Sequence, residues 1–273
     1  MTELELVRSD ALRGVVVGIS VSDSADLSRL GLAQQHCELA VAELARAVFI
    51  AGGTIVYGGR LIPSGFTDIL IDEVRRYRED RDALVLCVPA SEHRRLSDDE
   101  LARCESELHT SAELVCLDAN GNMINIHNRP KEAEPGDPAA DLTAMRRHIT
   151  DRCGARVLVG GRLQGHQGSM PGVLEEAMMS VKASQPMYVA GGFGGAAAAV
   201  ASALGHEDGS WFPPHYPEHA DDHGGALSEL GRLAREVTPP HDGLSGAERR
   251  QLVASHRPGE ISSLTVKGLA HRG

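Results

Sequence analysis

Four segments rich in glycine and small hydroxyl residues are the places where this sequence could hold a phosphate or a ribose. Glycine lets a ligand approach the backbone closely, and free amide groups at the start of a helix attract anions. The candidate ligand-binding residues are Gly18, Ser20 and Ser22; Gly58, Gly59, Arg60, Gly65, Phe66 and Thr67; Gly160, Gly161, Arg162, Met170, Pro171 and Gly172; and Gly192. A tight turn explains any one segment, but four together favour a shared ligand cleft.

Charged residues beside these segments could add catalysis or anion binding. Arg60 and Arg162 each follow a Gly-Gly pair, where a guanidinium could clamp an anion. Glu175 and Glu176 lie near the start of a predicted helix, and Arg146 lies on the helix before it. The alternatives are acids that complement a helix dipole and an arginine on a solvated helix face.

Short apolar runs that alternate with helical patterns must position these residues. The predicted strands span 15–19, 54–57, 84–88, 113–117, 156–159 and 187–190, with a further extended piece at 123–126. The predicted helices span about 32–51, 65–78, 139–153 and 173–183, followed by an alanine-rich helix after 191–195. This alternation predicts an α/β fold with a doubly wound, mainly parallel sheet. Ligands of such sheets bind outside the carboxyl ends of the strands.

The pattern changes after about residue 205. Two or three short amphipathic helices are predicted, around 225–236, 245–254 and 259–269. We therefore expect residues 1–205 to form the ligand-binding domain, and 206–273 to form a helical extension that packs on it or on a partner subunit. The four histidines at 206, 215, 219 and 223 are irregularly spaced, so we expect no metal site there.

Composition excludes several classes of protein. The net charge of −11 over 273 residues disfavours binding to nucleic acids or anionic membranes. No G-x-G-x-x-G motif follows the first strand and no P-loop motif occurs, so neither dinucleotide dehydrogenases nor P-loop enzymes are indicated. The five cysteines lack C-x-x-C spacing, and no signal segment or membrane span is apparent. We expect a cytoplasmic protein without a cofactor.

The order of elements and loops resembles the SLOG superfamily, which includes the Lonely Guy phosphoribohydrolases, the DNA-processing protein A fold and nucleotide-sensing domains of bacterial defence systems. The resemblance covers about residues 14–205. It rests on Met145-Arg146-Arg147 one helix before Gly160-Gly161, and on Leu174-Glu175-Glu176 in the helix that follows. Val159 stands where the enzymes have proline, and the insert 162–172 replaces their short glycine-threonine turn.

This resemblance implies a Rossmann-like fold, a nucleotide ligand and a homodimer or higher homo-oligomer. It also implies hydrolysis of an N-glycosidic bond, in which Glu175 or Glu176 would stabilise an oxocarbenium-like centre or position water. Arg146 would then bind phosphate or the departing base. The longer insert favours the alternative of a non-catalytic sensor of a nucleotide-derived signal. A third hypothesis is a partner-binding role for the helical extension.

Overall fold

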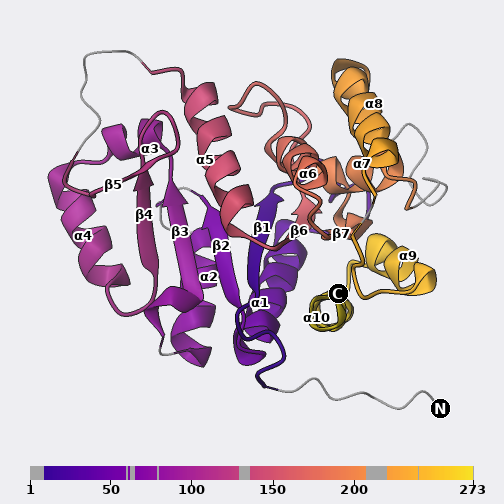
Figure 1. Cartoon of the computed structure of the whole chain (residues 1–273), viewed down its shortest axis with the longest axis horizontal. Helices are drawn as coiled ribbons and strands as arrows, with labels where there is room; N and C mark the ends of the chain where they lie inside the picture. The colour runs from indigo at the N-terminus through magenta and orange to yellow at the C-terminus, as the bar shows by residue number, and fades with distance from the viewer. Residues whose placement is uncertain are drawn as a thin grey trace.

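A seven-stranded sheet forms the centre of the computed structural model, which describes residues 9–59, 61, 65–78, 80–128, 136–206, 220–238 and 240–272 (Figure 1). Its strands are β1 (Val16–Ser22), β2 (Thr54–Gly58), β3 (Leu84–Val88), β4 (Glu113–Leu117), β5 (Met123–Ile124), β6 (Ala155–Gly160) and β7 (Met187–Ala190). Their spatial order is β5-β4-β3-β2-β1-β6-β7. Every pair is parallel except β4 with β5, so the predicted doubly wound, mainly parallel sheet is confirmed.

The parallel strands are largely buried on both faces, which is why they appear in the sequence as continuous apolar runs. In β3, Leu84 and Leu86 pack into the core on one face, whereas Val85 and Cys87 pack into the core on the other. Successive side chains of a strand point to opposite faces, so a strand covered on both sides has no polar alternation.

Two layers of helices cover the sheet. The helices before the extension are α1 (Gln34–Ile50), α2 (Phe66–Tyr77), α3 (Ala90–Arg95), α4 (Asp98–Leu108), α5 (Pro138–Arg152), α6 (Gly172–Lys182) and α7 (Gly195–Ala203), with 3-10 turns η1 (Arg81–Ala83) and η2 (Gly191–Phe193). In Figure 1, α5 and α6 lie in front of the sheet and α1 and α2 behind it. The polar segment between β3 and β4 contains α3 and α4, two helices that the predicted ranges do not include.

The predicted C-terminal helical extension is present as α8 (Ala220–Glu236), α9 (Gly246–Ala254) and α10 (Pro258–His271). Helix α8 contacts α6 and α7, α9 contacts β7 and η2, and α10 lies along α1. Ile261 and Leu269 of α10 join the same apolar core as Leu44 and Val48 of α1. The division of the chain at residue 205 stays a prediction.

Strand β1 is longer than its apolar run suggested. The sequence predicted an end at Ile19, but the strand continues to Ser22 because β6 pairs with it up to Ser22 opposite Gly160. Ser20 and Ser22 are therefore strand residues rather than loop residues. Their positions are fixed by the hydrogen bonds of the sheet.

The strand order reverses at β1, which lies between β2 and β6. The chain builds β2, β3 and β4 on one side and then crosses to β6 and β7 on the other. A crevice forms at such a reversal, outside the carboxyl ends of the strands. The fold thus predicts a ligand site beside the ends of β1 and β6.

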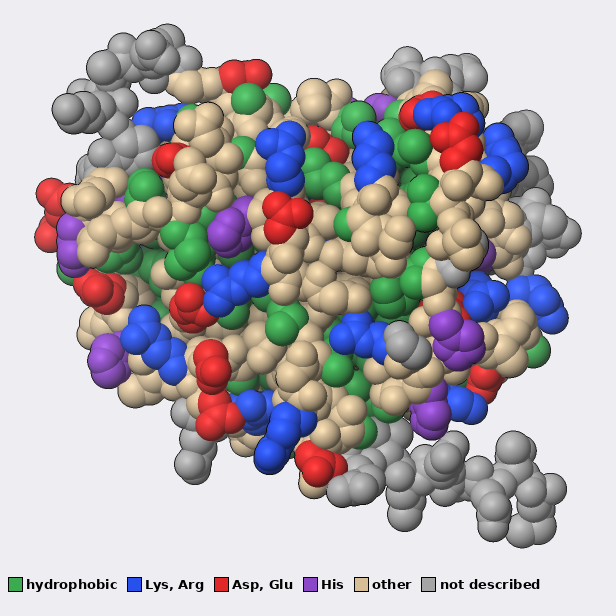
Figure 2. Space-filling view, in the orientation of Figure 1, with side chains coloured by type: hydrophobic (Ala, Val, Ile, Leu, Met, Phe, Trp, Pro, Cys, Tyr) green, Lys and Arg blue, Asp and Glu red, His purple; other side chains and the backbone are tan. Residues whose placement is uncertain are grey.

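The surface is mixed in charge. On the face drawn in Figure 2, acidic and basic side chains are interspersed, so the net charge of −11 is not gathered there into one acidic field. Within the described ranges, no helix has both the length and the apolar character needed to cross a bilayer.

Candidate functional site

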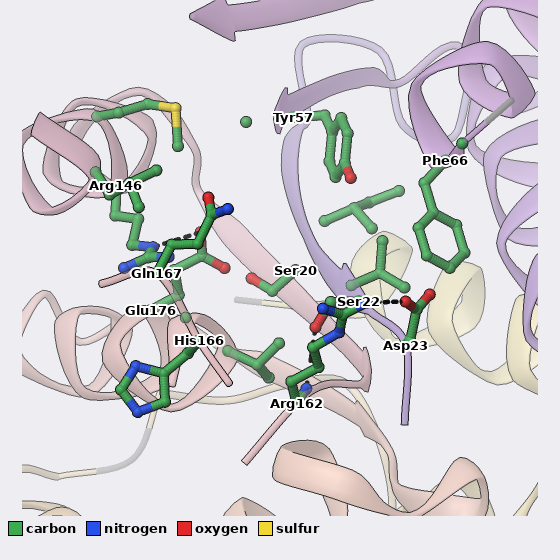
Figure 3. Close-up of a pocket in the computed structure, with 18 of the residues that line it drawn as sticks. Ser20, Ser22, Asp23, Tyr57, Phe66, Arg146, Arg162, His166, Gln167 and Glu176 are labelled. Carbon is green, nitrogen blue, oxygen red and sulfur yellow. Dashed lines mark hydrogen bonds and ion pairs between the residues drawn. The ribbon is translucent and has the colours of Figure 1, made fainter. Parts of the chain in front are cut away.

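A cavity of about 380 Å³ opens at the predicted crevice, where β1, β2, α2, α5 and α6 meet (Figure 3). The residues predicted from the sequence that line it are Ser20, Ser22, Gly58, Gly65, Phe66, Thr67, Arg146, Arg162, Gly172 and Glu176. They come from three of the four glycine-rich segments, from the helix that carries Arg146, and from α6, which carries Glu176. The fold brings these segments together, and their role in binding remains a prediction.

Other predicted residues lie outside the cavity lining: Gly18, Gly59, Gly160, Gly161, Met170, Pro171, Glu175 and Gly192. Gly18 is in the middle of β1, where an added Cβ would lie 3.0 Å from Cys153 Sγ. Gly161 has a φ of +104°, and an added Cβ would lie 2.8 Å from Val173. These two glycines serve close packing of β1 and of the β6–α6 connection. Arg60 lies outside the described residues.

The fourth glycine-rich segment faces the C-terminal helices. A Cβ added to Gly192 would lie only 2.2 Å from the carbonyl oxygen of Ser255, at the end of α9. The start of α7 in the same segment is already occupied by an acid of the chain, because Gly195 N donates to Asp26 Oδ2 at 2.8 Å. The structure therefore places an internal carboxylate where the sequence suggested a ligand.

The two glutamates of α6 differ in their surroundings. Glu175 accepts hydrogen bonds from Thr143 Oγ1 at 2.6 Å and from Arg146 Nη1. Glu176 lines the cavity, is 8% exposed and has its carboxylate 3.9 Å from Arg146 Nε. Glu176 is thus the glutamate of this pair that can approach a ligand.

Sequence reasoning missed Arg156, which is completely buried on β6. Its guanidinium donates to Ser180 Oγ at 2.8 Å, Ser20 Oγ at 3.1 Å and Thr150 Oγ1 at 2.8 Å. Its Nη1 lies 3.6 Å from Glu176 Oε2. An arginine within an otherwise apolar strand was the available signal, because charged residues are almost never fully buried unless paired.

An ion pair lies beside the cavity. Arg162 Nη2 donates to Asp23 Oδ2, and Arg162 N donates to Ser22 Oγ at 3.0 Å. Both charged side chains are about half exposed and both line the cavity. The pair joins the end of β1 to the segment after β6, so an anionic ligand that recruits Arg162 must compete with Asp23.

One side of the cavity is aromatic. Figure 3 shows Tyr57 and Phe66 on the side of the cavity away from Arg146 and His166. Ser20 lies between these two sides. Burial, and secondarily the charges of Glu176 and Asp23, raise the pKa of the Tyr57 phenol, which therefore keeps its proton. This side offers flat apolar surfaces and one neutral hydroxyl group.

Two helices begin at the cavity. Helix α2 starts after Gly65 and α6 starts after Pro171, and neither residue has a side chain that caps the helix. Phe66 and Gly172, the first residues of the two helices, line the cavity. Backbone amides at helix starts favour anions, so the cavity has two backbone features suited to a phosphate or carboxylate.

The segment between β6 and α6 connects the cavity to α8. His166 lines the cavity, and its ring centroid is 5.4 Å from that of His223 on α8. His223 Nε2 donates to the carbonyl oxygen of Leu163, and His166 Nδ1 is 2.9 Å from the carbonyl oxygen of Gly168. A movement of this segment would therefore change its contacts with α8.

The donor set does not suggest a metal. In the part of the chain that the structure describes, no group of three or more histidine, cysteine, aspartate or glutamate residues is arranged to hold an ion. The side chains that line the cavity offer guanidinium, carboxylate, hydroxyl, imidazole and amide groups.

Comparison with models of protein families identified a match. The family model described as SLOG cluster2 matches residues 11–238. The match includes the whole sheet, every residue of the cavity and α8. A search of curated proteins gave no match.

Proposed function

The chain belongs to the SLOG cluster2 family, and on that premise we propose that its cavity binds a nucleotide or a nucleotide-derived ligand. The observation that carries the proposal is the convergence of Arg146, Arg162 and two helix starts on one cavity with an aromatic side. The cations and helix starts suit a phosphate. Tyr57 and Phe66 suit a planar base.

The reaction that we propose is hydrolysis of the N-glycosidic bond. Water adds to the anomeric carbon, the bond from that carbon to the base breaks, and the base departs with a proton. Glu176 would stabilise the positive charge that develops on the sugar or accept a proton from the water. Arg146, beside Glu176, would bind the phosphate or the departing base.

The alternative is a sensor that binds the nucleotide without turnover. The contacts of His223 with Leu163 and His166 support it, because they link the cavity segment to α8. A ligand that prefers one arrangement of this segment would also favour one position of α8. The family resemblance further supports a homodimer or higher oligomer, which light scattering would test.

Incubation with nucleoside monophosphates, followed by chromatography for free base, distinguishes the two functions. For the enzyme we expect base release that Glu176→Gln abolishes. The matched control is Glu107→Gln, since Glu107 is exposed on α4 and lies outside the cavity. Thermal stabilisation without release would support the sensor. At a ligand concentration of 100 Kd, the stabilisation should be about 2.7 kcal/mol. If no nucleotide of the panel gives either base release or thermal stabilisation, nucleotide binding is refuted.

A further inference from the structure

Arg156 is an arginine at a place where a charge is strongly unfavourable. It lies on β6 at 0% exposure, beneath the cavity, and touches β1, α5 and α6. A buried guanidinium requires both satisfied N–H groups and a compensating negative charge. The surroundings of Arg156 should therefore contain a negatively charged partner.

Hydroxyl groups satisfy most of its donors but cannot balance its charge. Ser180, Ser20 and Thr150 accept from Nε, Nη1 and Nη2 at 2.8, 3.1 and 2.8 Å. The carboxylate that meets it, among the residues described, is Glu176, with Oε2 3.6 Å from Nη1. Glu176 is therefore the negative partner of Arg156.

Glu176 also lies near Arg146, so the site contains two arginines and two glutamates. Arg146 donates to Glu175 Oε2, and its Nε is 3.9 Å from Glu176 Oε1. Without Arg156, Arg146 would have to balance both carboxylates. With Arg156 in place, Arg146 balances Glu175 and no longer has to balance Glu176 as well, so its charge can also serve an anion of a ligand.

We propose that Arg156 is a positioning residue of the cavity, whose charge fixes Glu176 and leaves Arg146 available to an anionic group of the ligand. The first part concerns the fold of this chain. The second part rests on the proposed nucleotide function, so the two parts need separate measurements.

The ion pair is tested by thermal unfolding of Arg156→Met, Glu176→Gln and the double variant. Each single variant leaves a buried charge with fewer partners, and we expect midpoints lowered by about 6–20 °C. Glu176→Gln should lower the unfolding midpoint much less when Arg156 has already been replaced by methionine. Additive losses would overturn the pairing, whatever the protein binds. If Arg156→Met does not fold, Arg156→Lys replaces it. Lysine keeps the positive charge, so Glu176→Gln should lower the unfolding midpoint of Arg156→Lys by nearly as much as it lowers that of the wild type.

The availability of Arg146 is tested by calorimetric titration with adenosine 5′-monophosphate and adenosine. In Arg156→Met, or in Arg156→Lys if needed, we expect affinity for the monophosphate to fall relative to adenosine, by about tenfold for methionine. Ser180→Ala is the matched control, because it removes one hydrogen bond of Arg156 but keeps both charges. A merely structural role would lower stability in both variants and leave the ratio of the two affinities unchanged.

The outcomes separate the two proposals. Coupled stabilities with a lowered affinity ratio support both parts. Coupled stabilities with an unchanged ratio overturn the role of Arg156 toward Arg146. If the wild type binds neither compound, the nucleotide function and the ligand-dependent part fail together, while coupled stabilities still uphold the ion pair.

Discussion

Gly192→Ala separates packing from ligand binding in the fourth glycine-rich segment. The added methyl group would lie 2.2 Å from Ser255 O, 2.4 Å from Ser255 C and 2.8 Å from Ala254 O, whereas ordinary contacts are at least 3.4 Å. All three atoms belong to the backbone at the end of α9, so no side-chain rotation relieves the overlap. Either η2 or the end of α9 has to move.

The expected cost follows from this overlap. Overpacking a well-packed core costs about 1–3 kcal/mol, and backbone contacts place Gly192→Ala toward the upper end of that range. Unfolding midpoints fall by about 2–4 °C per kcal/mol in domains of this size. We therefore expect urea unfolding to show a loss of about 2–3 kcal/mol with an unchanged m-value.

Gly225→Ala is the control for this experiment. Gly225 lies within α8, is exposed and has no atom within 4 Å of an added Cβ. The same substitution should therefore stabilise the protein by about 0.5–1 kcal/mol. Equal stabilities of the two variants would refute the packing argument. Loss of nucleotide-induced stabilisation in Gly192→Ala, with unchanged unfolding, would instead place Gly192 in the ligand site.

Three further predictions concern other contacts. Burial, and secondarily Arg249, lowers the pKa of His206 from 6.5 to about 4. As the pH falls, the unfolded chain therefore takes up a proton at His206 before the folded protein does, and the free energy of unfolding should fall by about 3 kcal/mol between pH 6.5 and 4. The free energy of unfolding of His206→Gln should depend less steeply on pH over this range. Asp26→Ala removes the acceptor at the start of α7 and should cost about 1–2 kcal/mol in urea unfolding, whereas Asp26→Asn should cost less. Asp23→Asn breaks a half-exposed ion pair, so stability should change by less than about 1 kcal/mol, while calorimetry should show tighter binding of nucleoside monophosphates.

The sheet was predictable because strands that are buried on both faces appear in the sequence as short continuous apolar runs. The runs at 84–88 and 187–190 coincide with β3 and β7. Alternation with helical patterns then fixed the parallel, doubly wound arrangement. Three glycine-rich segments meet at one cavity because they lie at or just after the carboxyl ends of β1, β2 and β6, which are neighbours in the sheet.

Contacts between residues far apart in the chain could not be predicted from the sequence. A glycine that admits a ligand looks the same as one that admits a backbone, and only the position of Ser255 distinguishes Gly192. The pairing of Asp23 with Arg162 depends on the register of β1 against β6, which no local pattern specifies. The choice between Glu175 and Glu176 likewise depends on how α6 is turned toward Arg146.

The packing of α10 along α1 has a consequence for the order in which the protein folds. The core behind the sheet contains Leu44 and Val48 from α1 together with Ile261 and Leu269 from α10. During synthesis, the apolar side of α1 leaves the ribosome long before the residues that cover it. This part of the core therefore closes only after translation has passed α10, and until then α1 exposes a surface that chaperones recognise.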